Sequence, residues 1–76
     1  MTTIRITTAA GTNASSVADS HVLGNFEAPV NWRNSVDRCD SDGCGRVFID
    51  CDHRADAEYI AEQLDTDDRV SSYEIL

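Results

Sequence analysis

The stretch CGRVFIDCDHRADAEYIAEQLD, residues 44–65, changes its hydrophobic period halfway along and so decides the fold class. Its first half, residues 44–51, is rich in Val, Phe and Ile and predicts a β-strand. Its second half predicts a helix over residues 53–65 with Asp52 as the N-cap, because four apolar residues recur at helical spacing: Ala57, Ile60, Ala61 and Leu64. A strand followed at once by an amphipathic helix indicates a domain that combines strands with helices.

Three further segments have the character of strands. Residues 2–8, TTIRITT, alternate Ile with Thr and Arg, which is typical of a half-buried strand. Residues 32–39, WRNSVDRC, precede the strand predicted over residues 44–51 and are predicted to be its hairpin partner. Residues 70–76, VSSYEIL, place Tyr73 and Ile75 on one face and predict the last strand.

Residues 14–23, ASSVADSHVL, are ambiguous, because the pattern fits a helix capped by Thr12 or Asn13 but also an extended arm. With this helix the element order is βαββαβ, the ferredoxin-like plan. Without it, one helix covers an antiparallel sheet. Both alternatives give a two-layer α+β sandwich, and 76 residues are enough for a single domain over residues 1–76.

A hairpin over residues 32–51 with Asp40 to Gly43 as its four-residue loop gives a register that sorts charged from apolar residues. On the outer face it pairs Asp37 with Arg46, Ser35 with Phe48, and Arg33 with Asp50; on the inner face it pairs Val36 with Val47, Asn34 with Ile49, and Trp32 with Cys51. Phe48 then resembles an interface anchor, an exposed aromatic flanked by charge, unless another part of the chain covers it.

The three cysteines permit a metal or redox site, which the same register disfavours. Cys39 and Cys44 lie opposite each other on the outer face, whereas Cys51 points inward and is expected in the core. A zinc site needs its ligands to converge, so we expect no metal and no cofactor. A zinc- or redox-responsive module built on Cys39 and Cys44 remains the alternative.

The charge balance is strongly acidic. Fourteen acids face six bases, all of them arginine, for a net charge of −8. Such a surface repels nucleic acid and anionic membranes and attracts basic protein surfaces. The N-terminal residues lack the continuous apolar core of a secretory signal, so we expect a cytoplasmic protein without membrane contact.

No nucleophile motif, phosphate loop or dinucleotide fingerprint is present, so we expect a non-enzyme. We predict an interaction module that binds a basic, nucleic-acid-binding surface of a partner protein. The residues predicted to contact the partner are Asp40, Asp42, Phe48, Asp65, Asp67 and Asp68. A structural or assembly subunit is a further alternative, and the sequence does not specify an oligomeric state.

In size, acidity, compact α+β plan and lack of catalytic motifs, the chain resembles the small phage-encoded inhibitors of bacterial defence, including anti-CRISPR proteins. The resemblance rests on composition over the whole chain and carries no residue-level motif. It implies an inhibitor that occupies a nucleic-acid-binding site by imitating phosphate charge.

Overall fold

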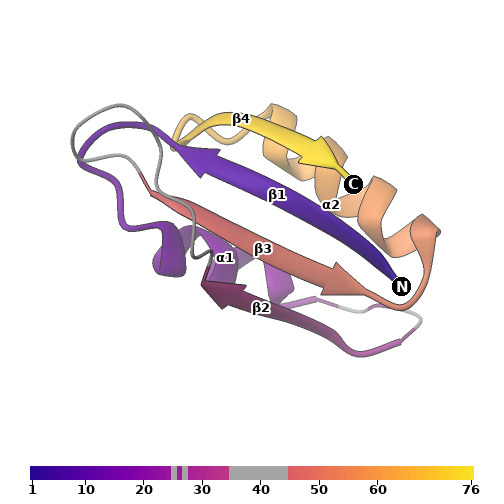
Figure 1. Ribbon diagram of the computed structural model, residues 1–76. Coiled ribbons are helices and arrows are strands. Elements are labelled where there is room, and N and C mark those ends of the chain that lie inside the picture. The colour runs from indigo at the N-terminus through magenta and orange to yellow at the C-terminus, as the bar shows by residue number, and fades with distance from the viewer. Residues whose placement is uncertain (25, 27, 35–44) are drawn as a thin grey trace.

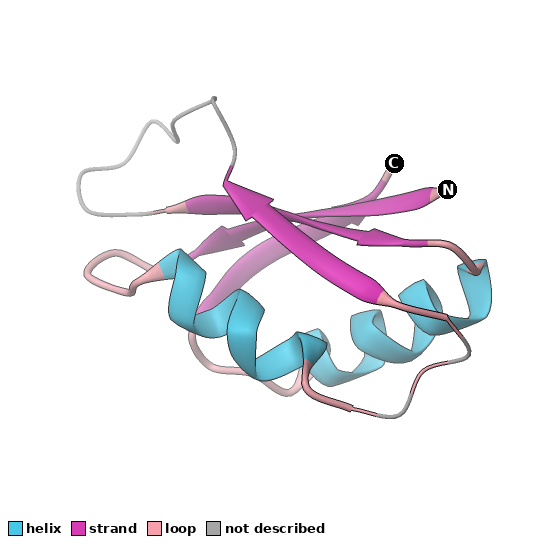
Figure 2. Ribbon diagram, turned by 90° about the horizontal axis from the view of Figure 1, so that it is seen from below, coloured by secondary structure: helices cyan, strands magenta, loops and turns pink. Residues whose placement is uncertain are grey.

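The computed structural model is a four-stranded antiparallel sheet in the order β2-β3-β1-β4, with two helices covering one of its faces (Figures 1 and 2). The structure describes residues 1–24, 26, 28–34 and 45–76. Its elements in chain order are β1 (Thr2–Thr8), α1 (Ala14–Val22), β2 (Val30–Asn34), β3 (Arg46–Cys51), α2 (Arg54–Asp65) and β4 (Val70–Ile75). The predicted two-layer α+β fold is confirmed, while the finer, ferredoxin-like assignment stays a prediction.

The sequence predicts the first residue of both helices to within one position. The Asn13 side chain accepts hydrogen bonds from the backbone N–H of Ser15 (2.9 Å) and Ser16 (3.4 Å), and this cap starts α1. The second helix, α2, begins at Arg54 with His53 as its N-cap, so the Asp52 cap predicted from sequence is wrong by one residue. Within the described part of the chain, no helix is long and apolar enough to cross a bilayer.

The core lies between the helices and the inner face of the sheet. Buried residues alternate along the two central strands: Ile4, Ile6, Val47 and Ile49 are 0% exposed and Cys51 is 1% exposed. The helices contribute small and branched side chains to the same cluster: Ala18, Ala57, Ile60 and Leu64. Fully burying a Val, Leu or Ile side chain stabilises a fold by about 1.5–3 kcal/mol, so this layer is the main source of stability.

The β2–β3 register differs by two residues from the one that the sequence predicts. Arg33 lies opposite Phe48, not opposite Asp50, and Trp32 lies opposite Ile49, not opposite Cys51. The faces are nevertheless as predicted, because side chains alternate with period two and an even shift leaves each on its own side. The pairs predicted for Ser35, Val36 and Asp37 lie outside the described residues.

Trp32 is on the inner face, where its sequence position places it, and is half-buried against the core. Its ring N–H donates a hydrogen bond to the Asp19 carboxylate on α1. This contact fastens the first helix to the edge strand β2, so the polar atom of the indole is satisfied while its rings pack inward.

Candidate functional site

No helix of the described residues lies on the outer face of the sheet (Figure 2). Phe48 is on this face, on β3 between β1 and β2. Arg5 on β1 and Arg33 on β2 are both directly opposite Phe48 in the sheet. The Arg33 guanidinium carbon lies 4.5 Å from the centre of the phenyl ring, close enough for a cation–π contact. Phe48 is therefore half-buried under a basic side chain, on the face that the sequence predicts.

The arginines on this open face are engaged by neighbouring strands. Arg33 pairs with Asp50 at 2.8 Å, and Arg5 pairs with Glu74 at 2.5 Å. Burial raises the pKa of Asp50, but hydrogen bonds from Arg33 and Thr3 outweigh it, so that pKa lies below its usual value. Two of the three arginines here are thus neutralised locally.

The three acids predicted near the end of α2 do not form one patch. Asp67 turns inward, where its carboxylate accepts hydrogen bonds from the Arg69 side chain at 2.8 and 3.0 Å and lies 2.8 Å from His21 Nε2. The Asp67 side chain is only 10% exposed. The hydrogen bonds from Arg69 are the main reason that the pKa of Asp67 lies far below its usual range. This residue holds the α2–β4 turn against α1.

Asp65 and Asp68, by contrast, face solvent. Asp65 accepts a hydrogen bond of 2.7 Å from the Tyr73 hydroxyl, which raises the pKa of the tyrosine and joins α2 to β4. Asp40 and Asp42 lie outside the described residues, so the structure places neither of them. The partner-binding roles of all these residues stay predictions.

The helix α2 brings Asp65 together with two acids that the predicted set lacks. Glu58, Glu62 and Asp65 recur at i, i+4 and i+7, so they lie on one flank of the helix, and all are exposed. The Asp65–Tyr73 bond shows that this flank is turned toward β4. We call these three residues the acidic flank. Their helical spacing is visible in the sequence and could have identified them.

Charge is divided between the two sides of the molecule. The open sheet face holds three of the five described arginines and only two of the ten described acids: Arg5, Arg33, Arg46, Asp50 and Glu74. The rest of the described chain therefore carries eight acids against two arginines. The acidic flank and Phe48 lie on opposite sides, so one flat partner surface cannot contact both.

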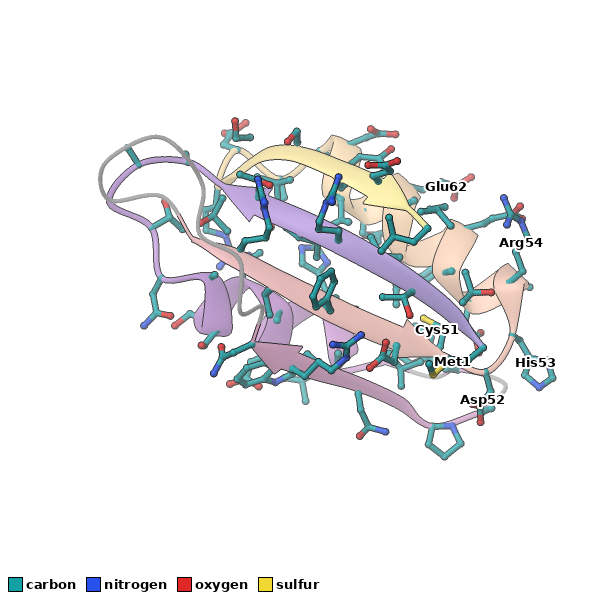
Figure 3. The ribbon with its side chains drawn as sticks, viewed as in Figure 1. Met1, Cys51, Asp52, His53, Arg54 and Glu62 are labelled. Carbon is teal, nitrogen blue, oxygen red and sulfur yellow. The ribbon has the colours of Figure 1, made fainter. Side chains whose placement is uncertain are left out.

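Cys51 is a core residue, as the sequence predicts. Burial, with the nearby charges of Asp56, Asp50 and Asp52, raises the pKa of its thiol to about 11. Figure 3 shows it at the end of β3, close to Met1. Among the described residues no group of His, Cys, Asp and Glu side chains is arranged to hold a metal ion. Cys39 and Cys44 lie outside that part, so the zinc or redox alternative stays untested.

Comparison of the chain with protein-family models, with curated proteins and with solved structures finds no match. The candidate site therefore rests on its own geometry: a flank of exposed carboxylates on α2, set apart from the sheet face that carries most of the described arginines.

Proposed function

We propose that the protein is a small inhibitory interaction module. Its acidic flank binds a basic, nucleic-acid-binding surface of a partner protein and so competes with the nucleic acid for that surface. Asp68, exposed beyond the end of α2, is a further predicted contact. Asp40 and Asp42 remain predicted additional contacts.

The observation that carries this proposal is the division of charge. Arginines gathered on the open sheet face cannot neutralise the acids of α2, so the helix side keeps its negative potential. Among the described residues, the flank's ion pair joins Arg54 to Glu58 at 3.3 Å, with both side chains more than 60% exposed. Exposed pairs of this kind contribute about 0–1 kcal/mol, so a partner's arginine or lysine can replace Arg54.

The Tyr73–Asp65 bond gives the flank a fixed position relative to the sheet. Because α2 already fixes the backbone of these residues, binding has to order only their side chains, at about 0.5–1.5 kcal/mol each. Their negative potential speeds the encounter with a basic surface. Because such attraction is screened by salt, binding that depends on the acidic flank must weaken as ionic strength rises.

The test is capture of partners by the immobilised chain from a lysate of its native host, at low and at high salt. We expect a nucleic-acid-handling protein that is retained at low salt and released by added DNA or RNA. The triple variant Glu58→Gln, Glu62→Gln, Asp65→Asn should retain at least tenfold less of that protein. Asn at position 65 keeps an oxygen that can accept the Tyr73 hydrogen bond.

A matched control removes the same number of charges elsewhere, through Asp19→Asn, Asp52→Asn and Glu74→Gln. This control should keep most of the partner. Equal losses in both variants would show that net charge alone matters. Retention that neither the flank variant nor added nucleic acid reduces would refute the proposal.

A further inference from the structure

Among the described residues β4 is one edge of the sheet, with no strand on the side away from β1, and α2 packs against it (Figure 1). The backbone N–H of Leu76 donates to the carbonyl of Thr3 at 2.8 Å, so this pair is hydrogen-bonded across the β1–β4 ladder. Hydrogen-bonded and non-hydrogen-bonded pairs alternate in antiparallel sheets. Tyr73 and Ile75 therefore point their backbone N–H and C=O groups away from β1, toward the open edge.

The inner-face side chains of β4 are also less covered than those of the central strands. Tyr73 and Ile75 are half-buried, whereas Ile6 and Ile4, which lie opposite them on β1, are 0% exposed. The other edge strand, β2, follows directly after Pro29, a residue that protects sheet edges. The β4 residues include no proline, and Glu74, the charged residue among them, is paired with Arg5.

A groove lies beside this edge, between the end of α2 and the start of β4. It is lined by Leu64, Asp65, Asp67, Val70, Ser71, Ser72 and Tyr73. The acidic flank continues along α2 from Asp65, whose hydrogen bond to Tyr73 joins it to β4. The open edge thus offers backbone hydrogen-bonding groups, part of an apolar surface and a row of carboxylates together.

Two acids of that row have nearly the spacing of alternate residues in an extended chain. Glu58 and Glu62 are one turn apart, a rise of about 6 Å along the helix. Residues i and i+2 of a β-strand, which share a face, are about 6.6 Å apart. Two basic residues at alternate positions of a strand placed beside β4 therefore have nearly the same spacing as Glu58 and Glu62.

We propose that an extended basic segment of the partner protein adds to β4 as a fifth, antiparallel strand, with alternate arginine or lysine side chains facing the acidic flank. This inference rests on the proposed function and specifies how the partner is bound. Backbone bonds to Tyr73 and Ile75 would supply affinity, and the acids would select a basic sequence. A second copy of this chain fits the edge less well, since each copy carries a net charge of −8.

The probe is a synthetic peptide of about ten residues that alternates Arg with Val, titrated into the isotope-labelled full chain at low salt. We expect amide hydrogen exchange at Tyr73 and Ile75 to slow at least tenfold. Shift changes should concentrate on β4 and the acidic flank. A peptide that alternates Glu with Val should not bind.

Two methylated peptides test the strand geometry. In an antiparallel pair the peptide residues that face the flank also direct their N–H groups at β4. Methylating the backbone nitrogens of the arginines should therefore weaken binding at least tenfold. Methylating the backbone nitrogens of the valines instead gives a peptide of equal charge and bulk. Its affinity should differ from that of the unmethylated peptide by less than threefold. The reverse order would overturn the proposal.

Other outcomes separate the two proposals. Binding that shifts Glu58 and Glu62 but leaves exchange at Tyr73 and Ile75 unchanged would overturn strand addition and leave the proposed function standing. Failure of the Arg–Val peptide to bind would also overturn strand addition, while the capture experiment judges the proposed function independently. A dimeric solution mass with both amides protected before peptide is added would show that a second copy occupies the edge.

Discussion

The two faces of the sheet differ in what their side chains do, although they share the same strands. On β3, Ile49 is 0% exposed under the helices, while Phe48, its neighbour in sequence, lies half-buried on the open face beneath Arg33. Residue type alone would place both in a core. Position in the alternation separates them, and it also places Arg5, Arg33 and Arg46 on the open face.

The largest effect that follows from this difference is on stability. Replacing a fully buried Ile by Ala costs about 2–5 kcal/mol, so Ile49→Ala should remove a large part of the stability of so small a domain. Phe48→Ala leaves no enclosed cavity and should cost about 1 kcal/mol. Urea unfolding followed by the fluorescence of Trp32 measures both losses. Equal losses would mean that something covers the open face.

The next effect contrasts two neighbouring acids, Asp67 and Asp68. Asp67→Asn should cost about 1.5–3 kcal/mol at neutral pH, because it weakens charge-assisted bonds to Arg69 and His21. Asp68→Asn, at an exposed position, should change the free energy of unfolding by less than about 0.5 kcal/mol. Urea unfolding at neutral pH compares the two, and equal effects would refute the structural role of Asp67.

The pKa of Asp67 also predicts how the stability difference between wild type and Asp67→Asn changes with pH. The pKa of Asp67 is lowered by folding, so the stability gained from its charge is present above the unfolded pKa of about 3.9. It is lost as pH falls toward the lower folded pKa. The gap between wild type and Asp67→Asn should therefore be widest near neutral pH and shrink below about pH 4. A gap that grows in acid would contradict the assignment.

The sequence predicts the faces of the sheet correctly and its register incorrectly, for one reason. Alternation determines which side a residue takes, but any even shift preserves that pattern, so two registers differing by two residues satisfy it equally. Arg33 still reaches Asp50 at 2.8 Å, although the two are no longer directly opposite. A correct ion pair was therefore compatible with an incorrect register.

The candidate site was predictable in part. Glu58, Glu62 and Asp65 share a helix flank through local spacing, which any helical wheel displays. The inward turn of Asp67 depends on His21, which is 46 residues away in sequence and contributed by another helix. No local pattern contains that contact, so Asp67 has the same appearance in the sequence as its exposed neighbour Asp68.

A smaller effect concerns the contact between Arg33 and Phe48. A double-mutant cycle built from Arg33→Met and Phe48→Leu should give a coupling energy of about 0.5–1 kcal/mol, the size expected for an exposed cation–π pair. The cycle is measured by urea unfolding. Arg5, also opposite Phe48 but paired with Glu74, offers a control cycle that should show less coupling. No coupling in the Arg33 cycle would exclude a cation–π contribution.

The smallest effect tests whether the acidic flank serves folding at all. Glu58 and Glu62 are like charges four residues apart on α2, a spacing that destabilises a helix by about 0.2–0.5 kcal/mol. Glu62→Gln should therefore raise the free energy of unfolding by that amount at low salt, and the gain should disappear at high salt because screening already removes the repulsion. Thermal unfolding at two salt concentrations measures it. A loss of stability at low salt would mean that Glu62 supports the fold, whereas a gain means that folding does not explain the charge, and binding is the remaining role that the flank's geometry supports.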